Sequence, residues 1–175
     1  MSVTQSKVLK NSNLCLDNFN QLADNQRMEQ KTKKAQVVLA AIDEASQNFK
    51  FLLLQTNERR GKFWQNVTGK VEAEETFEEG GLREAIEETQ LDLESIVDLV
   101  DLGLEYKFTD QHGRKVQEKC FLIILDKTWK VKIDPKEHVD LKWISPSEIQ
   151  DGIVKYQSNL ETLQKAKLIL RHWGI

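Results

Sequence analysis

The stretch that decides the fold is GKVEAEETFEEGGLREAIEETQL, residues 69–91. Thr76 and Glu79 have the spacing of a capping box, in which a hydroxyl and a carboxylate each accept a hydrogen bond from a free backbone N–H at a helix start. An apolar stripe then recurs at the helical period, at Phe77, Leu82, Ala85, Ile86 and Thr89. Gly80 and Gly81 each cost about 1 kcal/mol relative to alanine in mid-helix. We therefore expect this helix to lie very close to a sheet, where bulk is excluded.

The same stretch concentrates negative charge. Between residues 69 and 92 there are nine acids and two bases, although the whole chain has a net charge of only −3. Glu84, Glu87 and Glu88 are three and four residues apart, so their carboxylates lie along one side of the helix and repel one another. Divalent cations such as Mg²⁺ take oxygen ligands and commonly share them with phosphates. The spacing predicts a cation site, and the plainer alternative is a solvated acidic face.

Outward from this helix, short apolar runs predict strands and a further helix without a strict alternation of the two. The expected elements are strands at residues 36–42, 49–55, 96–108, 116–125 and 141–144, a helix start at 145–149 and a C-terminal helix at 156–173. No internal repeat is found in the sequence. We expect one domain of the α/β (α+β) class.

Composition limits the class of protein further. The chain has 175 residues, of which 39% are hydrophobic and 30% charged, and this excludes a disordered or low-complexity chain. No stretch approaches the roughly 18 continuous apolar residues of a membrane helix, and residues 1–10 lack the apolar core of a secretory signal. Cys15 and Cys120 cannot form a disulfide framework. We expect a cytoplasmic protein that is not bound to a membrane.

Residues 1–34 are polar and are expected to be an N-terminal extension of unknown role ahead of a domain at residues 35–175. Within the extension, Leu16, Phe19 and Leu22 are three residues apart, which allows a short docking helix. A mobile tail is an equal alternative, and no residue of the segment points to chemistry.

Gly69, Glu75 and the run REAIEETQL at residues 83–91 closely resemble the Nudix box, G-x5-E-x7-R-E-U-x-E-E-x-G-U, where U is aliphatic. At average residue usage, its six fixed matches through Glu88 occur by chance roughly once in ten million starts, and the local richness in glutamate weakens this by about two orders of magnitude. The departure is Gln90, where the box has the glycine that usually adopts a left-handed conformation after a helix. Glutamine can adopt this conformation at a cost of about 1 kcal/mol, or the helix can end differently. Because no carboxylate is lost, we expect altered local geometry rather than lost activity.

This resemblance implies a Nudix-like α/β/α sandwich with a mixed sheet. It also implies hydrolysis of a nucleoside diphosphate linked to another group, with Mg²⁺ or Mn²⁺ as the cofactor. Carried across by the motif, Glu84, Glu87 and Glu88 would be metal ligands, and Arg83 would orient them.

Two shorter runs, FWQNVTG at residues 63–69 and EHVDLKW at residues 137–143, look similar to the branch of the family that hydrolyses dihydroneopterin triphosphate and dATP-like nucleotides. By that resemblance Thr68 contacts the substrate, and Glu137 is a further metal ligand or the general base. Glu87, Glu137 and Arg83 then form the expected catalytic group. The plainer alternative for Glu137 is a surface acid, and for Trp64 a core position is favoured over a stacking role.

Basic side chains near these runs are candidates for binding phosphates, namely Arg59, Arg60 and Lys62 with Lys33 and Lys34. Exposure for solubility alone is an equal alternative. The histidines are not at ligand spacing and are expected to be structural or exposed, at His112, His138 and His172.

The expected reaction is metal-dependent cleavage of a (deoxy)nucleoside or pterin triphosphate to a monophosphate and pyrophosphate by a monomer or homodimer. Hydrolases of dinucleoside polyphosphates and of triphosphorylated RNA 5′ ends also contain the Phe-Trp-Gln run, so such an enzyme is the alternative. Gln90 motivates an alternative of another class, a catalytically silent module that binds a nucleotide without turnover.

Overall fold

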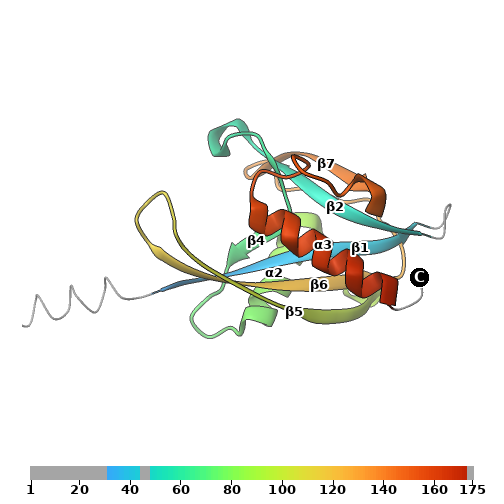
Figure 1. The fold of residues 1–175 in the computed structure, drawn as a ribbon, viewed down its shortest axis with the longest axis horizontal. Helices are drawn as coiled ribbons and strands as arrows, with labels where there is room; N and C mark the ends of the chain where they lie inside the picture. Colours follow the sequence, from blue (N-terminus) through green and yellow to red (C-terminus); the bar gives the residue numbers. More distant parts are fainter. Residues whose placement is uncertain (1–30, 44–47, 173–175) are drawn as a thin grey trace, which may run out of the picture.

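The computed structural model describes residues 31–43 and 48–172 (Figure 1). In this part of the chain seven strands form one mixed sheet. The strands are β1 (Thr32–Asp43), β2 (Asn48–Thr56), β3 (Trp64–Gln65), β4 (Val67–Lys70), β5 (Ile96–Thr109), β6 (Lys115–Leu125) and β7 (His138–Ile144). The helices are α2 (Phe77–Thr89) and α3 (Gln157–His172), with short 3₁₀ turns η1 (Glu58–Arg60), η2 (Leu93–Ser95) and η3 (Pro146–Glu148).

Strand β1 is the centre of the sheet. It pairs in parallel with β6 over most of its length, from Thr32 opposite Val116 to Ala41 opposite Leu125. Its other edge is shared, because the first half of β1 pairs with β4 and the second half pairs with β2, both antiparallel. Strand β2 also pairs with β3 and with β7, both antiparallel. Strand β4 and the group formed by β2, β3 and β7 therefore occupy different parts of the same edge of β1.

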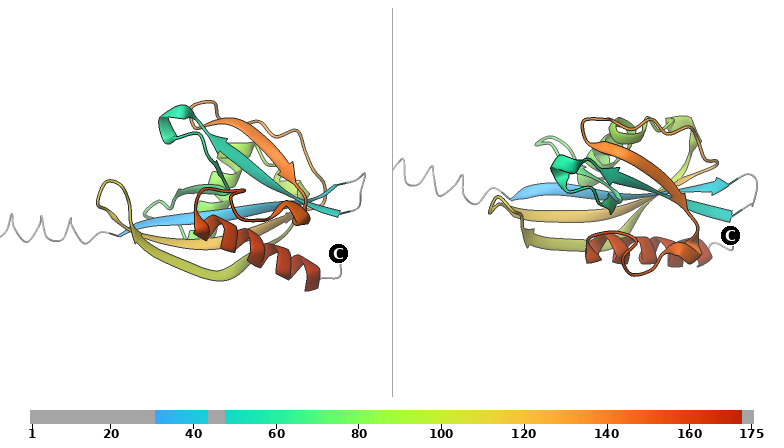
Figure 2. Two further views of the ribbon diagram at one scale, coloured as in Figure 1. Left: turned by 45° about the horizontal axis from the view of Figure 1, so that its top comes forward. Right: turned by 90° about the horizontal axis from the view of Figure 1, so that it is seen from above.

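The two faces of the sheet carry separate cores, because side chains alternate along each strand. Val38, Leu122 and their neighbours pack against α3, while Val37 and Phe121 pack on the face that α2 covers. Viewed along the sheet, the two helices lie on opposite sides of it (Figure 2). The layering is the α/β/α sandwich with a mixed sheet that the sequence predicts.

Helix α2 begins as the capping-box spacing predicts. The Glu79 N–H donates to the Thr76 hydroxyl at 3.1 Å, and the Thr76 N–H donates to the Glu79 carboxylate at 2.8 Å. A methyl group on Gly81 would lie 3.0 Å from Val37 and 3.2 Å from Ala35 of β1. The glycine pair therefore lets the helix approach the sheet closely, as expected.

The helix ends at Gln90 in the left-handed conformation, with φ 52° and ψ 44°. The Gln90 N–H donates to the Ile86 carbonyl at 2.8 Å, so the helix end is closed as a glycine would close it. The carbonyl of Thr89 accepts from the indole of Trp129 and from the backbone N–H of Lys132, each at 3.2 Å. Glutamine at this position thus preserves the local geometry of the box, and the expectation of an altered helix end is wrong.

Some element boundaries differ from those that the sequence predicts. Strand β1 begins at Thr32, because the polar residues before the apolar run pair with β4 and β6. The helix start at residues 145–149 is only the 3₁₀ turn η3. The possible helix at residues 16–22 lies outside the described residues. No helix of the described chain is long and apolar enough to cross a membrane.

Candidate active site

Arg83 on α2 is the hub of a hydrogen-bonded acidic cluster. Its Nε and Nη2 donate to the two carboxylate oxygens of Glu75 at 2.7 and 3.0 Å, and Nη2 also donates to the carbonyl of Lys70. Its Nη1 donates to Glu84 at 3.0 Å and to Glu87 at 3.1 Å. The planar guanidinium therefore fixes the orientation of three carboxylates, which is the orienting contact expected of Arg83.

Glu75 anchors this guanidinium. The hydrogen bonds from Arg83, together with one from the backbone N–H of Glu72, lower the pKa of Glu75 to about 2. The same pairing raises the pKa of Arg83. Both groups are ionised across the physiological pH range, so the ion pair with Glu75 holds the guanidinium of Arg83 in a fixed position.

Glu84 lies directly over Gly69 of β4. A methyl group on Gly69 would come within 1.8 Å of the Glu84 carboxylate carbon, so only glycine leaves room for this side chain. Burial raises the pKa of Glu84, and the hydrogen bond from Arg83 opposes that effect. The glycine that opens the motif is therefore required by the carboxylate fifteen residues later.

Glu88 is the most buried of the helix acids, with 4% of its surface exposed. Burial raises its pKa well above the usual value, and the nearby carboxylates of Glu84 and Glu137 raise it further. Its Oε2 atom has no hydrogen-bond partner among the described residues. A buried, unpaired carboxylate is costly unless a cation compensates it.

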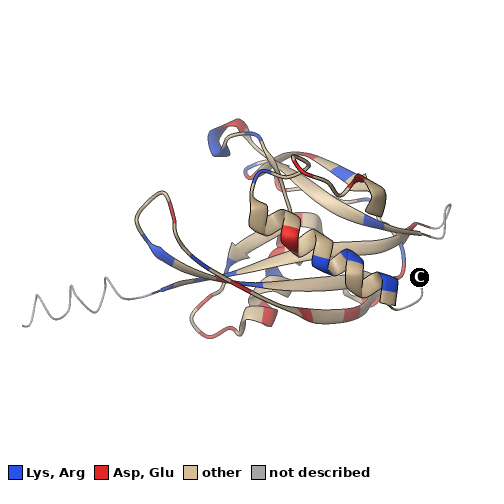
Figure 3. Ribbon diagram, viewed as in Figure 1, with Lys and Arg blue, Asp and Glu red and all other residues tan. Residues whose placement is uncertain are grey.

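Glu137 reaches this cluster from the loop before β7, forty-nine residues further along the chain. Its backbone is tied to the η1 turn, because its carbonyl accepts from the Asn57 N–H at 2.9 Å. Its carboxylate accepts from Nη1 of Arg60 at 2.7 Å. Figure 3 shows this turn as a basic tip of the molecule. The structure thus joins Glu137 to Arg60 and brings both to the end of α2.

His138, the first residue of β7, also belongs to this cluster. From the sequence we expect it to be structural or exposed and not at ligand spacing. Ligand atoms of Glu88, Glu137 and His138 all lie within 4.8 Å of one another. The imidazole is buried, and burial with the nearby Arg60 charge lowers its pKa, so it is neutral. The signal in the sequence is the Glu-His pair at the start of a strand, but its partner Glu88 is fifty residues away.

The expected substrate-binding residues are not all brought to this cluster. Thr68 precedes Gly69 on β4, so its side chain points to the opposite face of the sheet, and its hydroxyl donates to Glu118 at 3.3 Å. Arg59 is exposed, and Lys33 lies over the ring of Phe77 at 5.7 Å. Of the described basic residues named as phosphate candidates, Arg60 is the one bonded to a candidate ligand.

Thr68 instead ends a buried polar chain on the α3 face that sequence reasoning did not find. Gln36 donates to Glu118 at 3.0 Å and accepts from the amide of Asn66 at 2.9 Å. The backbone N–H of Asn66 in turn donates to the Asn159 side chain at 2.9 Å. These contacts join β1, β6, the β3–β4 link and the start of α3, and they set the direction of the Thr68 hydroxyl.

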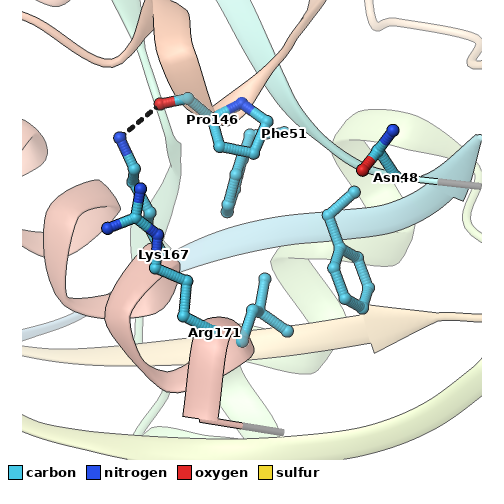
Figure 4. Close-up of a pocket in the computed structure, with 7 residues that line it drawn as sticks. Asn48, Phe51, Pro146, Lys167 and Arg171 are labelled. Atoms are coloured by element: carbon cyan, nitrogen blue, oxygen red, sulfur yellow. Dashed lines mark hydrogen bonds between the residues drawn. The ribbon is translucent and has the colours of Figure 1, made fainter. Parts of the chain in front are cut away.

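The pocket of about 200 Å³ drawn in Figure 4 lies elsewhere, beside α3. It is lined by Phe49 and Phe51 of the α3-side core and by Lys167, whose Nζ donates to the Pro146 carbonyl at 2.6 Å. Typical ligand pockets begin at roughly 300 Å³. The acidic cluster lies on the other face of the sheet, and we assign no catalytic role to this pocket.

The acidic cluster suits a divalent cation. It offers carboxylate oxygens from two separate segments, and one buried oxygen of Glu88 is without a partner in the described chain. Oxygen ligands of this kind are those of Mg²⁺ and Mn²⁺. The residues present therefore fit the metal that the motif implies.

The mixed sheet between two helices, one of which carries acids packed against a glycine of the sheet, matches the architecture that the motif implies for a hydrolase of phosphoanhydride bonds. The NUDIX domain family model matches residues 32–164. The chain belongs to the NUDIX family, as the motif predicts.

Individual relatives agree with this assignment. The dihydroneopterin triphosphate diphosphatase of Haemophilus influenzae is 30% identical over 149 residues, which is 79% of this chain and 91% of that protein. A NUDIX hydrolase of Listeria monocytogenes superposes with a TM-score of 0.67 at 26% identity, covering 79% of this chain and 94% of that one. The dihydroneopterin triphosphate pyrophosphohydrolase of Escherichia coli gives a TM-score of 0.64 at 26% identity, covering 78% and 95%.

Proposed function

We propose that this enzyme cleaves a (deoxy)nucleoside or dihydroneopterin triphosphate to a monophosphate and pyrophosphate. The observation that carries the proposal is the convergence of Glu88 and Glu137 around a buried carboxylate oxygen that has no hydrogen-bond partner in the described part of the chain. The substrate class is supported by the 30% identity to a diphosphatase of dihydroneopterin triphosphate over nearly its full length.

The cations, Mg²⁺ or Mn²⁺, would supply polarisation of the phosphoryl oxygens and neutralise the leaving pyrophosphate. Glu84, Glu87, Glu88 and Glu137 are the residues that would hold them. Arg83 keeps the carboxylates of Glu84 and Glu87 oriented through its two Nη1 hydrogen bonds. These roles follow the motif.

Glu137 is also the proposed general base, because the loop before β7 presents it to the buried Glu88 from outside helix α2. In this role it takes the proton of the water that attacks phosphorus, while the bond to the pyrophosphate oxygen breaks. Arg60, now paired with Glu137, is placed to contact a phosphate oxygen of the substrate. Thr68, Arg59 and Lys33 remain proposed contacts for more distant parts of the substrate.

The proposed catalytic domain is residues 35–175, with residues 1–34 as an extension, in a cytoplasmic monomer or homodimer. Strand β1 begins at Thr32 and the family match begins at the same residue, so the last residues of the extension belong to the sheet.

A substrate panel with Mg²⁺ or Mn²⁺, scored by product identity, tests the function. Pyrophosphate and a monophosphate from dNTPs or dihydroneopterin triphosphate are expected. Turnover confined to dinucleoside polyphosphates or to triphosphorylated RNA would transfer the assignment to the alternative enzyme. Nucleotide binding without any product would identify a silent module.

Matched variants separate catalysis from general charge effects. Glu88→Gln removes a ligand charge at the cluster and should reduce turnover by orders of magnitude. Glu94→Gln, an exposed acid on the η2 turn, is the control and should keep the wild-type rate.

A further inference from the structure

The imidazole of His138 is buried, with 1% of the residue exposed, and neither ring nitrogen has a hydrogen-bond partner among the described residues. The Oε2 atom of Glu88 beside it is also without a partner in that part of the chain. Buried polar side chains nearly always have a partner, so three unsatisfied atoms at one place call for an explanation.

The spacing of these atoms fits a shared ion better than a direct bond. Nε2 of His138 is 3.9 Å from Oε2 of Glu88, which is too long for a hydrogen bond. Two ligand atoms that each lie about 2.1 Å from one cation are between about 3 and 4.2 Å apart. Ligand atoms of Glu88, Glu137 and His138 lie within 4.8 Å of one another, and the Glu137 side chain is 41% exposed and so can adjust.

We propose that Nε2 of His138 is a nitrogen ligand of the cation held by Glu88 and Glu137, and that this ligand makes the site select Mn²⁺ over Mg²⁺. The inference rests on the proposed function, because that function supplies the cation. Mg²⁺ takes oxygen ligands almost exclusively. Mn²⁺ shares the preference for carboxylate oxygen but, as a first-row transition metal, it accepts an imidazole nitrogen more readily than Mg²⁺ does. The backbone supports such a role, because the His138 N–H donates to the Asp134 carbonyl at 2.9 Å and fixes the start of β7.

Electron spin-echo spectroscopy of the full chain loaded with Mn²⁺ alone tests the ligand directly. The wild type should show modulation from a directly bound ¹⁴N nucleus, and labelling of histidine with ¹⁵N should change that signal. The signal should vanish in His138→Ala and persist in His112→Ala, the control at an exposed histidine. Absence of nitrogen modulation in the Mn²⁺-loaded wild type would overturn the inference.

Metal affinities give a second readout. In His138→Ala the affinity for Mn²⁺ should fall about tenfold or more, while the affinity for Mg²⁺ changes much less. His138→Gln fills the buried space with an oxygen ligand, and should lose the Mn²⁺ preference even if the alanine variant fails to fold. Equal losses for both metals would mean that His138 only orients Glu88 by hydrogen bonding, which contradicts the inference.

Failure here is distinguishable from failure of the proposed function, because both measurements use no substrate. Nitrogen-bound Mn²⁺ in a chain that turns over no triphosphate would refute the function alone. Triphosphate turnover with an all-oxygen Mn²⁺ signal would refute the ligand alone.

Discussion

Substitution of Gly69 by alanine should disable the enzyme without unfolding it. The new methyl group would lie 1.8 Å from the Glu84 carboxylate carbon, whereas ordinary contact begins at 3.4 Å, so that carboxylate must move by about 1.6 Å. Metal ligands tolerate about 0.2 Å, and a misplacement of about 1 Å in an active site can cost 100-fold in rate. We therefore expect kcat/KM to fall at least about 100-fold and the affinity for Mn²⁺ to fall with it.

Steady-state kinetics and Mn²⁺ titration measure these effects, and thermal denaturation checks the fold. Gly81→Ala is the matched control, because its methyl group would meet Val37 and Ala35 of the core instead of a carboxylate. That variant should lose stability and keep its Mn²⁺ affinity. If Gly69→Ala kept wild-type kinetics, Glu84 could not be a ligand at its observed position, and the reasoning would be wrong.

Three further predictions concern the ionisable groups. Without metal, Glu88→Gln should raise the melting temperature at pH 7 to 8, because burial raises the pKa of Glu88 in the folded protein well above its ordinary value of 4.5. The gain should shrink as the pH falls toward 4.5, where the carboxyl is protonated in both states, and a gain that stayed constant would contradict this cause. Glu75→Gln should lower the free energy of unfolding at neutral pH, because the pKa of Glu75 in the folded protein is about 2 and its ionised form is stabilised there. In denaturant titrations, the difference in free energy of unfolding between variant and wild type should disappear as the pH falls from 4.5 toward 2. Burial raises the pKa of the Cys120 thiol to about 12. Peptide mass spectrometry should therefore find Cys120 unmodified by iodoacetamide at pH 8 until the chain unfolds. Rapid labelling of the folded protein would contradict this and show that the core around Cys120 opens.

Local patterns were sufficient wherever a feature depends on residues close in sequence. The capping box and the close approach of the helix to the sheet at its glycine pair follow from residues within one helix, and the structure confirms both. The left-handed Gln90 is different, because the sequence left two ways of ending the helix open and the structure decided between them. The hydrogen bonds of Arg83 to Glu84 and Glu87 are of the same kind, because side chains on one helix meet at fixed offsets.

Contacts between distant segments required the structure. Resemblance led to Glu137, but only the fold shows that Arg60 is bonded to it and that its neighbour His138 faces Glu88. Thr68 could be named from the motif, yet the alternation of β4 turns its hydroxyl away from the carboxylates.

The sequence by itself determined the acid-bearing helix, because helix geometry converts residue spacing directly into shared faces. Its resemblance to the Nudix box indicated the family and the class of reaction. The tertiary structure alone decided which distant residues complete the site. Pairing of β7 with β2 carries His138 to Glu88, and no local pattern encodes that register. The register of the strands is fixed because each must bury its apolar side chains in one of the two cores on either face of the sheet. That burial is a property of the whole sheet and not of any one segment.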